Sequence, residues 1–211
     1  MKRTTLSAVI ALAVIATLFT STTPMNAAVV FSNVVGNCCG GFGVEGSNYG
    51  TAALGASFTS AGNYLMTDAQ VMVFQTLGNG GDPNFNVSLF SDPGGLPGSW
   101  IAALGVGLVA PNGGGIVTAS GATPMLAMGT TYWLVLTPFD ASTQIGWEMG
   151  GSPLVRLATS TSSTGSGGWS ALGLNDAQFQ IDGTAVPEPS SLLLMVSGAL
   201  GVIGAVRRRV R

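Results

Sequence analysis

The chain has 211 residues, of which 46% are hydrophobic and 8% are charged, and its formal net charge is −2. It contains no histidine, which excludes Ser-His-Asp and Cys-His nucleophile pairs and the common zinc sites. Six of the seven basic residues lie near the two ends, so the middle of the chain carries one basic residue against eight acidic ones, and this charge of −7 argues against nucleic-acid binding.

The N-terminus has the pattern of a secretory signal peptide. Two basic residues precede an apolar stretch from Leu6 to Phe19, and small residues follow at Ala27 and Ala28. We expect residues 1–28 to be a signal peptide that is removed on export. Residues 29–184 then have the length of one extracellular domain.

Two adjacent cysteines, Cys38 and Cys39, lie in a glycine-rich stretch near the start of this domain. In an exported protein, thiols tend to be oxidised. Adjacent cysteines can close only a strained vicinal disulfide, or else each finds a partner on another molecule. The sequence favours a rigid tight turn and leaves intermolecular cross-linking and a redox role open.

Short strands and turns account for the pattern of residues 29–184. Phe85–Phe90 and Gln178–Asp182 alternate apolar and polar side chains, which predicts half-buried antiparallel strands. Ala69–Thr76 and Thr130–Thr137 are apolar on both faces, which predicts central strands. Segments rich in Gly, Pro and Asn separate them. We therefore predict an all-β fold, an antiparallel two-sheet β-sandwich that is jelly-roll-like.

Several strand-turn motifs of this domain are similar to those of a bacterial surface module, the choice-of-anchor domain. They are Asn86–Gly98, Gly129–Leu136, Trp147 and Ala177–Ile181. The resemblance implies a β-sandwich, and it brings no assigned activity.

Tryptophans are the first candidates for ligand binding, because sugar rings stack on exposed indole faces. We select Trp100, Trp147 and Trp169 as possible sugar-binding residues and expect Trp133, inside a strand that is apolar on both faces, to be core.

The acidic residues give no catalytic or metal pattern. Asp82, Asp92 and Asp176 each lie beside Gly, Pro or Asn, so turn formation explains them more simply than calcium binding by loop oxygens. A carboxylate pair could still hydrolyse glycosides, but no spacing selects one. We expect no catalytic residues, no metal site, no cofactor and no enzymatic activity.

The last 27 residues, 185–211, have three parts. The first is Val186, Pro187, Glu188 and Pro189, whose prolines disfavour helix. An apolar run from Ser190 to Val206 follows, and as a helix of about 26 Å it would be a short transmembrane helix. Arg207, Arg208 and Arg209 then predict a cytoplasmic end.

This tail resembles the PEP-CTERM sorting signal of Gram-negative bacteria that make extracellular polysaccharide. The resemblance implies an inner-membrane anchor before processing, cleavage near Pro187-Glu188-Pro189 by the membrane protease exosortase, and transfer to the cell surface or extracellular matrix.

We therefore expect an exported, exosortase-sorted surface or matrix protein that is associated with exopolysaccharide and has a structural or adhesive role. The alternatives are a lectin-like carbohydrate-binding module and, more weakly, a glycoside hydrolase or lyase.

Overall fold

A computed structural model of the chain describes residues 27–36, 40–50, 52–76, 80–186, 198, 200 and 207–209. Residues 27–185 form one compact unit, which contains every strand that the structure describes. The predicted signal peptide and the expected transmembrane run lie outside the described residues, apart from Ala27, Ala28, Gly198 and Leu200. Among the residues that are described, no helix is both long enough and apolar enough to cross a membrane. The expected transmembrane span therefore stays a prediction.

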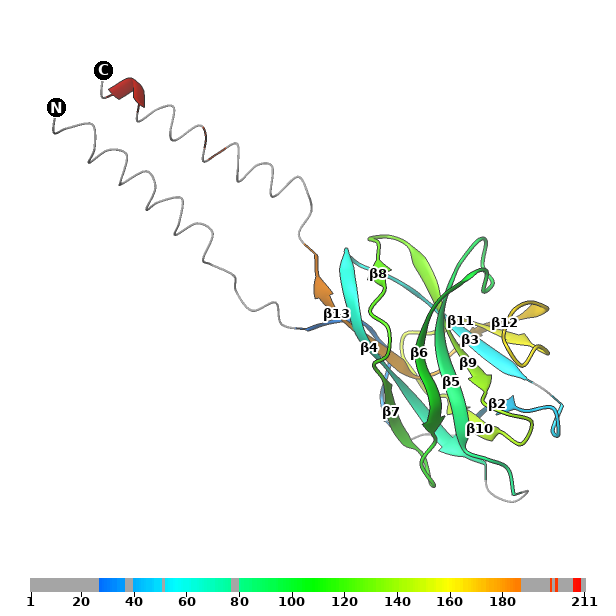
Figure 1. Cartoon of the computed structure of the whole chain (residues 1–211). Coiled ribbons are helices and arrows are strands. Elements are labelled where there is room, and N and C mark those ends of the chain that lie inside the picture. Colours follow the sequence, from blue (N-terminus) through cyan, green and yellow to red (C-terminus); the bar gives the residue numbers. More distant parts are fainter. Residues whose placement is uncertain are drawn as a thin grey trace. The chain divides into compact units, whose positions relative to one another are not determined.

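The described residues form thirteen strands (Figure 1). They are β1 (Ala28–Ser32), β2 (Gly41–Glu45), β3 (Ala53–Thr59), β4 (Tyr64–Gln75), β5 (Asn84–Ser91), β6 (Trp100–Val109), β7 (Gly115–Ala119), β8 (Met125–Leu126), β9 (Thr131–Pro138), β10 (Gln144–Glu148), β11 (Val155–Ser160), β12 (Trp169–Asn175) and β13 (Phe179–Ala185).

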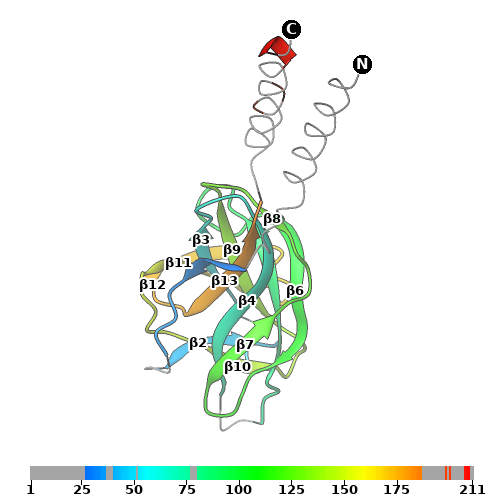
Figure 2. The same cartoon turned by 90° about the vertical axis from the view of Figure 1, so that its left-hand side faces the viewer.

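The strands build two antiparallel sheets. Sheet I has the order β1-β13-β4-β10-β2, with β7 and β8 also paired to the long strand β4. Sheet II has the order β12-β11-β3-β9-β5-β6. In Figure 1, β4 and β13 of sheet I lie to the left of β3, β11 and β12 of sheet II, and Figure 2 looks onto sheet I. The orders β2-β10-β4-β7 and β3-β9-β5-β6 are compatible with the expected jelly roll.

The main core lies between the sheets, because their inner faces supply one continuous set of buried apolar side chains. Its aromatic centre joins three strands: Phe31 of β1 stacks on Phe179 of β13, with ring centroids 4.8 Å apart, and Phe58 of β3 meets both rings. This packing confirms the all-β fold with two facing antiparallel sheets. It arises because alternate residues of each strand point to the same side.

All four predicted strands are present. Phe179 and Ile181 are fully buried in β13, as the alternation of Gln178–Asp182 predicts. Of the two segments that are apolar on both faces, Ala69–Thr76 overlaps β4 and Thr130–Thr137 overlaps β9, and each of these strands is paired along both edges. Trp133, in β9, is fully buried, which confirms it as core.

The ends of the compact unit lie on paired strands. β1 pairs antiparallel with β13, so that Ala28 is opposite Gly183, and β13 is paired along its other edge with β4. Ala185 ends β13 one residue before Val186. The predicted processing segment therefore follows directly from a strand that is paired on both sides.

Two carboxylates face each other on sheet I, where Asp182 of β13 is paired with Asp68 of β4. The pKa of Asp182 is raised, mainly because burial disfavours its charged form and also because of the charge of Asp68. Hydrogen bonds from Gln180 (2.9 and 3.1 Å) and from Gln70 (3.2 Å) oppose this rise in the pKa.

We expect Asp68→Asn to stabilise the folded protein at neutral pH by about 0.5 kcal/mol, as like charges on paired strands are destabilising. The folded state holds the Asp182 proton more tightly than the unfolded chain does, so stability falls as the pH rises from about 4 through the raised pKa. The gain should therefore shrink towards pH 3, where the raised pKa leaves Asp182 protonated and without charge. Urea unfolding at the two pH values measures this. Asp176→Asn, which changes the net charge equally outside the pair, should not reproduce the effect.

Candidate functional site

The outer face of sheet II is divided into an apolar half and a polar half. On β5 and β9 the outward side chains form the cross-strand pairs Phe90–Trp133, Ser88–Val135 and Asn86–Thr137. Phe90, Trp133 and Val135 belong to a second, smaller buried cluster outside the main core. The outer face therefore changes, along the strands, from covered apolar surface to polar surface.

Loops cover the apolar half. Leu96, from the β5–β6 connection, and Trp169, at the start of β12, pack against the second cluster. A hydrogen bond from Trp169 Nε1 to the carbonyl of Gly165 (3.0 Å) links the β11–β12 loop to this packed tryptophan. A side chain at Gly165 would meet Val135 and Thr137, so the loop lies close against β9 at this point.

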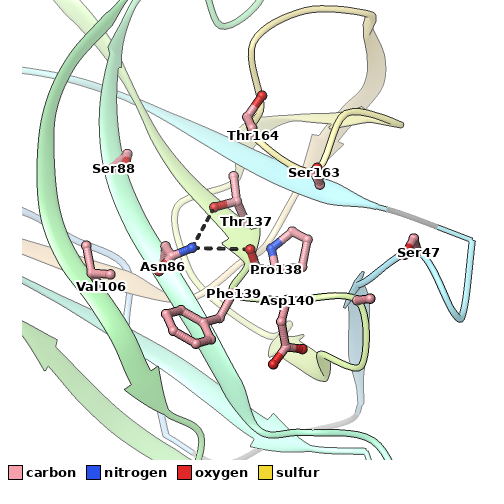
Figure 3. A pocket seen from close by; sticks show the side chains of 11 residues that line it. Ser47, Asn86, Ser88, Val106, Thr137, Pro138, Phe139, Asp140, Ser163 and Thr164 are labelled. Carbon is pink, nitrogen blue, oxygen red and sulfur yellow. Dashed lines mark hydrogen bonds between the residues drawn. The ribbon is translucent and has the colours of Figure 1, made fainter.

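The polar half forms a groove of about 470 Å³, within the range of small-ligand sites (Figure 3). It is bounded by β5, β6, the end of β9, and the β2–β3, β9–β10 and β11–β12 loops. Its lining residues are Ser47, Asn86, Ser88, Val106, Thr137, Pro138, Phe139, Asp140, Ala141, Ser163 and Thr164.

Asn86 ties together the strands on either side of it. Its Nδ2 donates to the carbonyl of Pro138 (3.2 Å) and, more weakly, to Thr137 Oγ1 (3.5 Å), both drawn in Figure 3. Its Oδ1 accepts the N–H of Gly107 (3.1 Å), at a position where φ is +62° and β6 is irregular. The amide therefore fixes the distance between β6 and the end of β9.

Phe139 presents the aromatic surface of the groove. Its side chain is 49% exposed, and its ring rests on Gly107, where an added Cβ would lie 3.4 Å from the ring. The hydroxyl of Thr143, a fully buried residue, accepts the N–H groups of Phe139 (3.0 Å) and Asp140 (3.1 Å) and donates to the carbonyl of Asn84 (2.8 Å). These bonds hold the β9–β10 loop in place.

Asp140 supplies the carboxylate of the groove. Its Oδ1 accepts hydrogen bonds from the N–H and the hydroxyl of Ser142, both at 2.8 Å. These bonds, that of the Ser142 hydroxyl first, hold the pKa of Asp140 below its usual value despite an opposing effect of burial. Within the described residues Oδ2 takes no hydrogen bond, so this oxygen can accept one from a ligand.

The predicted sugar-binding tryptophans do not lie together in this groove. Trp147 is fully buried, packs edge-on against Phe179 and donates from Nε1 to the carbonyl of Gln178 (2.9 Å), so the prediction that it stacks on sugars is wrong. Trp169 is half-buried and supports the β11–β12 loop. Trp100 is 60% exposed at the start of β6, outside the groove lining.

The remaining predicted positions fall into two groups. Cys38 and Cys39 lie outside the described residues, so the vicinal disulfide stays a prediction. Of the aspartates considered for calcium, Asp92 accepts the N–H groups of Gly94 and Gly95 in its turn, and Asp82 Oδ2 lies 3.3 Å from the Ser142 hydroxyl oxygen. Across the part of the chain that the structure describes, no three His, Cys, Asp or Glu side chains gather as a metal site.

The sorting tail is described in part. Val186 is half-buried just after β13, Pro187, Glu188 and Pro189 lie outside the described residues, and Arg207–Arg209 are exposed and helical. Comparison with known families matches residues 185–209 to the PEP-CTERM protein-sorting motif. The chain therefore carries the sorting signal of an exported protein that an exosortase processes. A search of curated proteins finds no match to the chain.

Proposed function

We propose that this protein is a non-catalytic component of the cell surface or extracellular matrix, associated with exopolysaccharide in a structural or adhesive role. The observation that carries the proposal is the sorting motif at residues 185–209, since it implies export and membrane-anchored processing before release to the surface. On this reading the apolar tail anchors the chain in the inner membrane until the exosortase acts, and the three arginines remain on the cytoplasmic side.

A non-catalytic role is supported by the chemistry of the groove. Asp140 is the one acidic residue among those that line it, whereas glycoside hydrolysis needs two carboxyl groups. The lowered pKa of Asp140 suits a permanent hydrogen-bond acceptor and not a general acid. The chain also has no histidine to act as a base.

In the producing cells we expect the tail to be removed. Mass spectrometry of protein taken from the surface should find a new C-terminus between Pro187 and Ser190, since proline disfavours helix formation and so favours access of a protease. Replacing Pro187, Glu188 and Pro189 with alanine should leave the full-length chain in the membrane fraction. A surface protein that still ends at Arg211 would reduce the tail to a plain anchor.

Association with polysaccharide is tested on the same material. We expect the processed protein to co-purify with exopolysaccharide through washes in 0.5 M salt, roughly the strength that screens charge contacts beyond a few ångströms. Enzymatic digestion of the polysaccharide should release the protein. Retention of the protein after complete digestion would contradict the proposal.

A further inference from the structure

We propose that the groove on the outer face of sheet II is a binding site for a neutral polysaccharide, with the Phe139 ring stacked on a sugar face and Asp140 accepting hydrogen bonds from sugar hydroxyls. This inference rests on the proposed association with exopolysaccharide and assigns it to one site. The residues that line the groove determine which ligand class fits.

The groove combines exposed apolar surface with hydroxyl groups. Phe139 is 49% and Val106 68% exposed, and five of the lining residues are serine or threonine. A pyranose has an apolar face of C–H groups and a rim of hydroxyls that both donate and accept hydrogen bonds. It can therefore cover the ring and meet the hydroxyls and the Asp140 carboxylate at the same time.

The charge of the groove favours a neutral ligand. No lining residue is basic, and Asp140 remains ionised. Arg156, the one basic residue between the signal peptide and the tail, lies 3.8 Å from Asp92 and does not line the groove. Uronate or sulfated chains would meet a negative surface without a cation to pair with.

The groove has a polar rim that is open to solvent and a floor that is fixed before any ligand binds. Ser47, Ser163 and Thr164 are exposed, and they come from loops at its rim. The floor is pre-formed, because Asn86 ties β6 to the end of β9 and Thr143 holds the β9–β10 loop, all with hydrogen bonds that need no ligand. Little ordering is then required on binding, which favours affinity.

The test is calorimetric titration of the full-length chain, purified in detergent, with β-glucan, mannan and galactan as neutral polymers and alginate as an acidic one. We expect binding to at least one neutral polymer and none to alginate. Phe139→Ala should raise Kd about tenfold or more, the scale of a buried aromatic anchor. Trp100→Ala is the matched control, since it removes a comparably exposed aromatic ring outside the groove and should leave Kd unchanged.

A second variant, Asp140→Asn, keeps the shape and the Oδ1 acceptor but removes the charge, and it should weaken neutral binding severalfold. If Trp100→Ala abolished the binding seen in the wild type and Phe139→Ala did not, the sugar site could not be the groove. The proposed function would remain intact. A preference for alginate would show that the ligand is acidic and would overturn the inference of a neutral one. Failure of the wild type to bind any neutral polymer would overturn the inference, and if the surface protein also failed to co-purify with exopolysaccharide, the proposed function would fall with it.

Discussion

Trp147→Ala is expected to lower the free energy of unfolding by about 3–5 kcal/mol, the usual cost of removing a large aromatic side chain from a core. Trp147 is fully buried, and its ring lies 6.0 Å from that of Phe179 at an angle of 63°. The change would also leave the carbonyl of Gln178 without the indole N–H that it accepts at 2.9 Å. Because small domains have only about 5–15 kcal/mol of stability, this loss is a large part of the total.

Urea unfolding followed by circular dichroism measures the effect. Trp100→Ala provides the comparison, because replacing an exposed tryptophan that is outside the core should change the free energy of unfolding by no more than about 0.5 kcal/mol. If the two variants unfolded at the same urea concentration, Trp147 could not be the core residue that the structure shows.

Gln178→Met should lower the free energy of unfolding by about 3 kcal/mol, although methionine nearly preserves the shape of glutamine. Gln178 is fully buried and its amide makes four hydrogen bonds with the main chain. Oε1 accepts the N–H groups of Val35 (2.9 Å) and Gly36 (3.1 Å), while Nε2 donates to the carbonyls of Gly36 (3.0 Å) and Met149 (2.8 Å). Each buried group that loses its partner costs about 1–3 kcal/mol, and water can restore some of them.

Gln178→Met should destabilise the backbone around Val35 and Gly36 in addition to the domain as a whole. Amide hydrogen exchange at Val35 and Gly36 should accelerate more than exchange at Leu134, in the centre of sheet II. Gln75→Met is the matched control, since Gln75 is half-buried in β4 and its side chain makes no hydrogen bond among the described residues. Equal effects of the two substitutions on stability would contradict the role of Gln178.

The fold could be predicted from local patterns because each strand carries its own burial signal. The alternation in Phe85–Phe90 and the two-sided apolar character of Thr130–Thr137 are properties of neighbouring residues, and the structure confirms both. Gln178 shows the limit of this reasoning. Alternation placed it on a solvated face, but it is buried because Val35, Gly36 and Met149 surround it, and these contacts span up to 143 residues of sequence.

The groove could not be predicted in the same way. Its residues come from five separate segments, and none forms a motif on its own. Tryptophan is the usual platform for sugars, but Trp147 lies in β10 (Gln144–Glu148), where apolar and polar residues alternate, and this alternation favours burial. The sequence gives a weaker indication that Phe139 is exposed. It is a large aromatic residue directly after a strand, and the turn-forming Asp140 follows it.

The position of β13 also determines how the domain would carry a pulling force. A load applied at Ala185 along the strand axis would be borne by a strand that is hydrogen-bonded to β1 on one edge and to β4 on the other. Strand pairs loaded along their length share the strain among all their hydrogen bonds at once, whereas pairs peeled from one end break bond by bond. While the protein is tethered through its C-terminus, shear across both ladders would therefore resist extraction of the last strand.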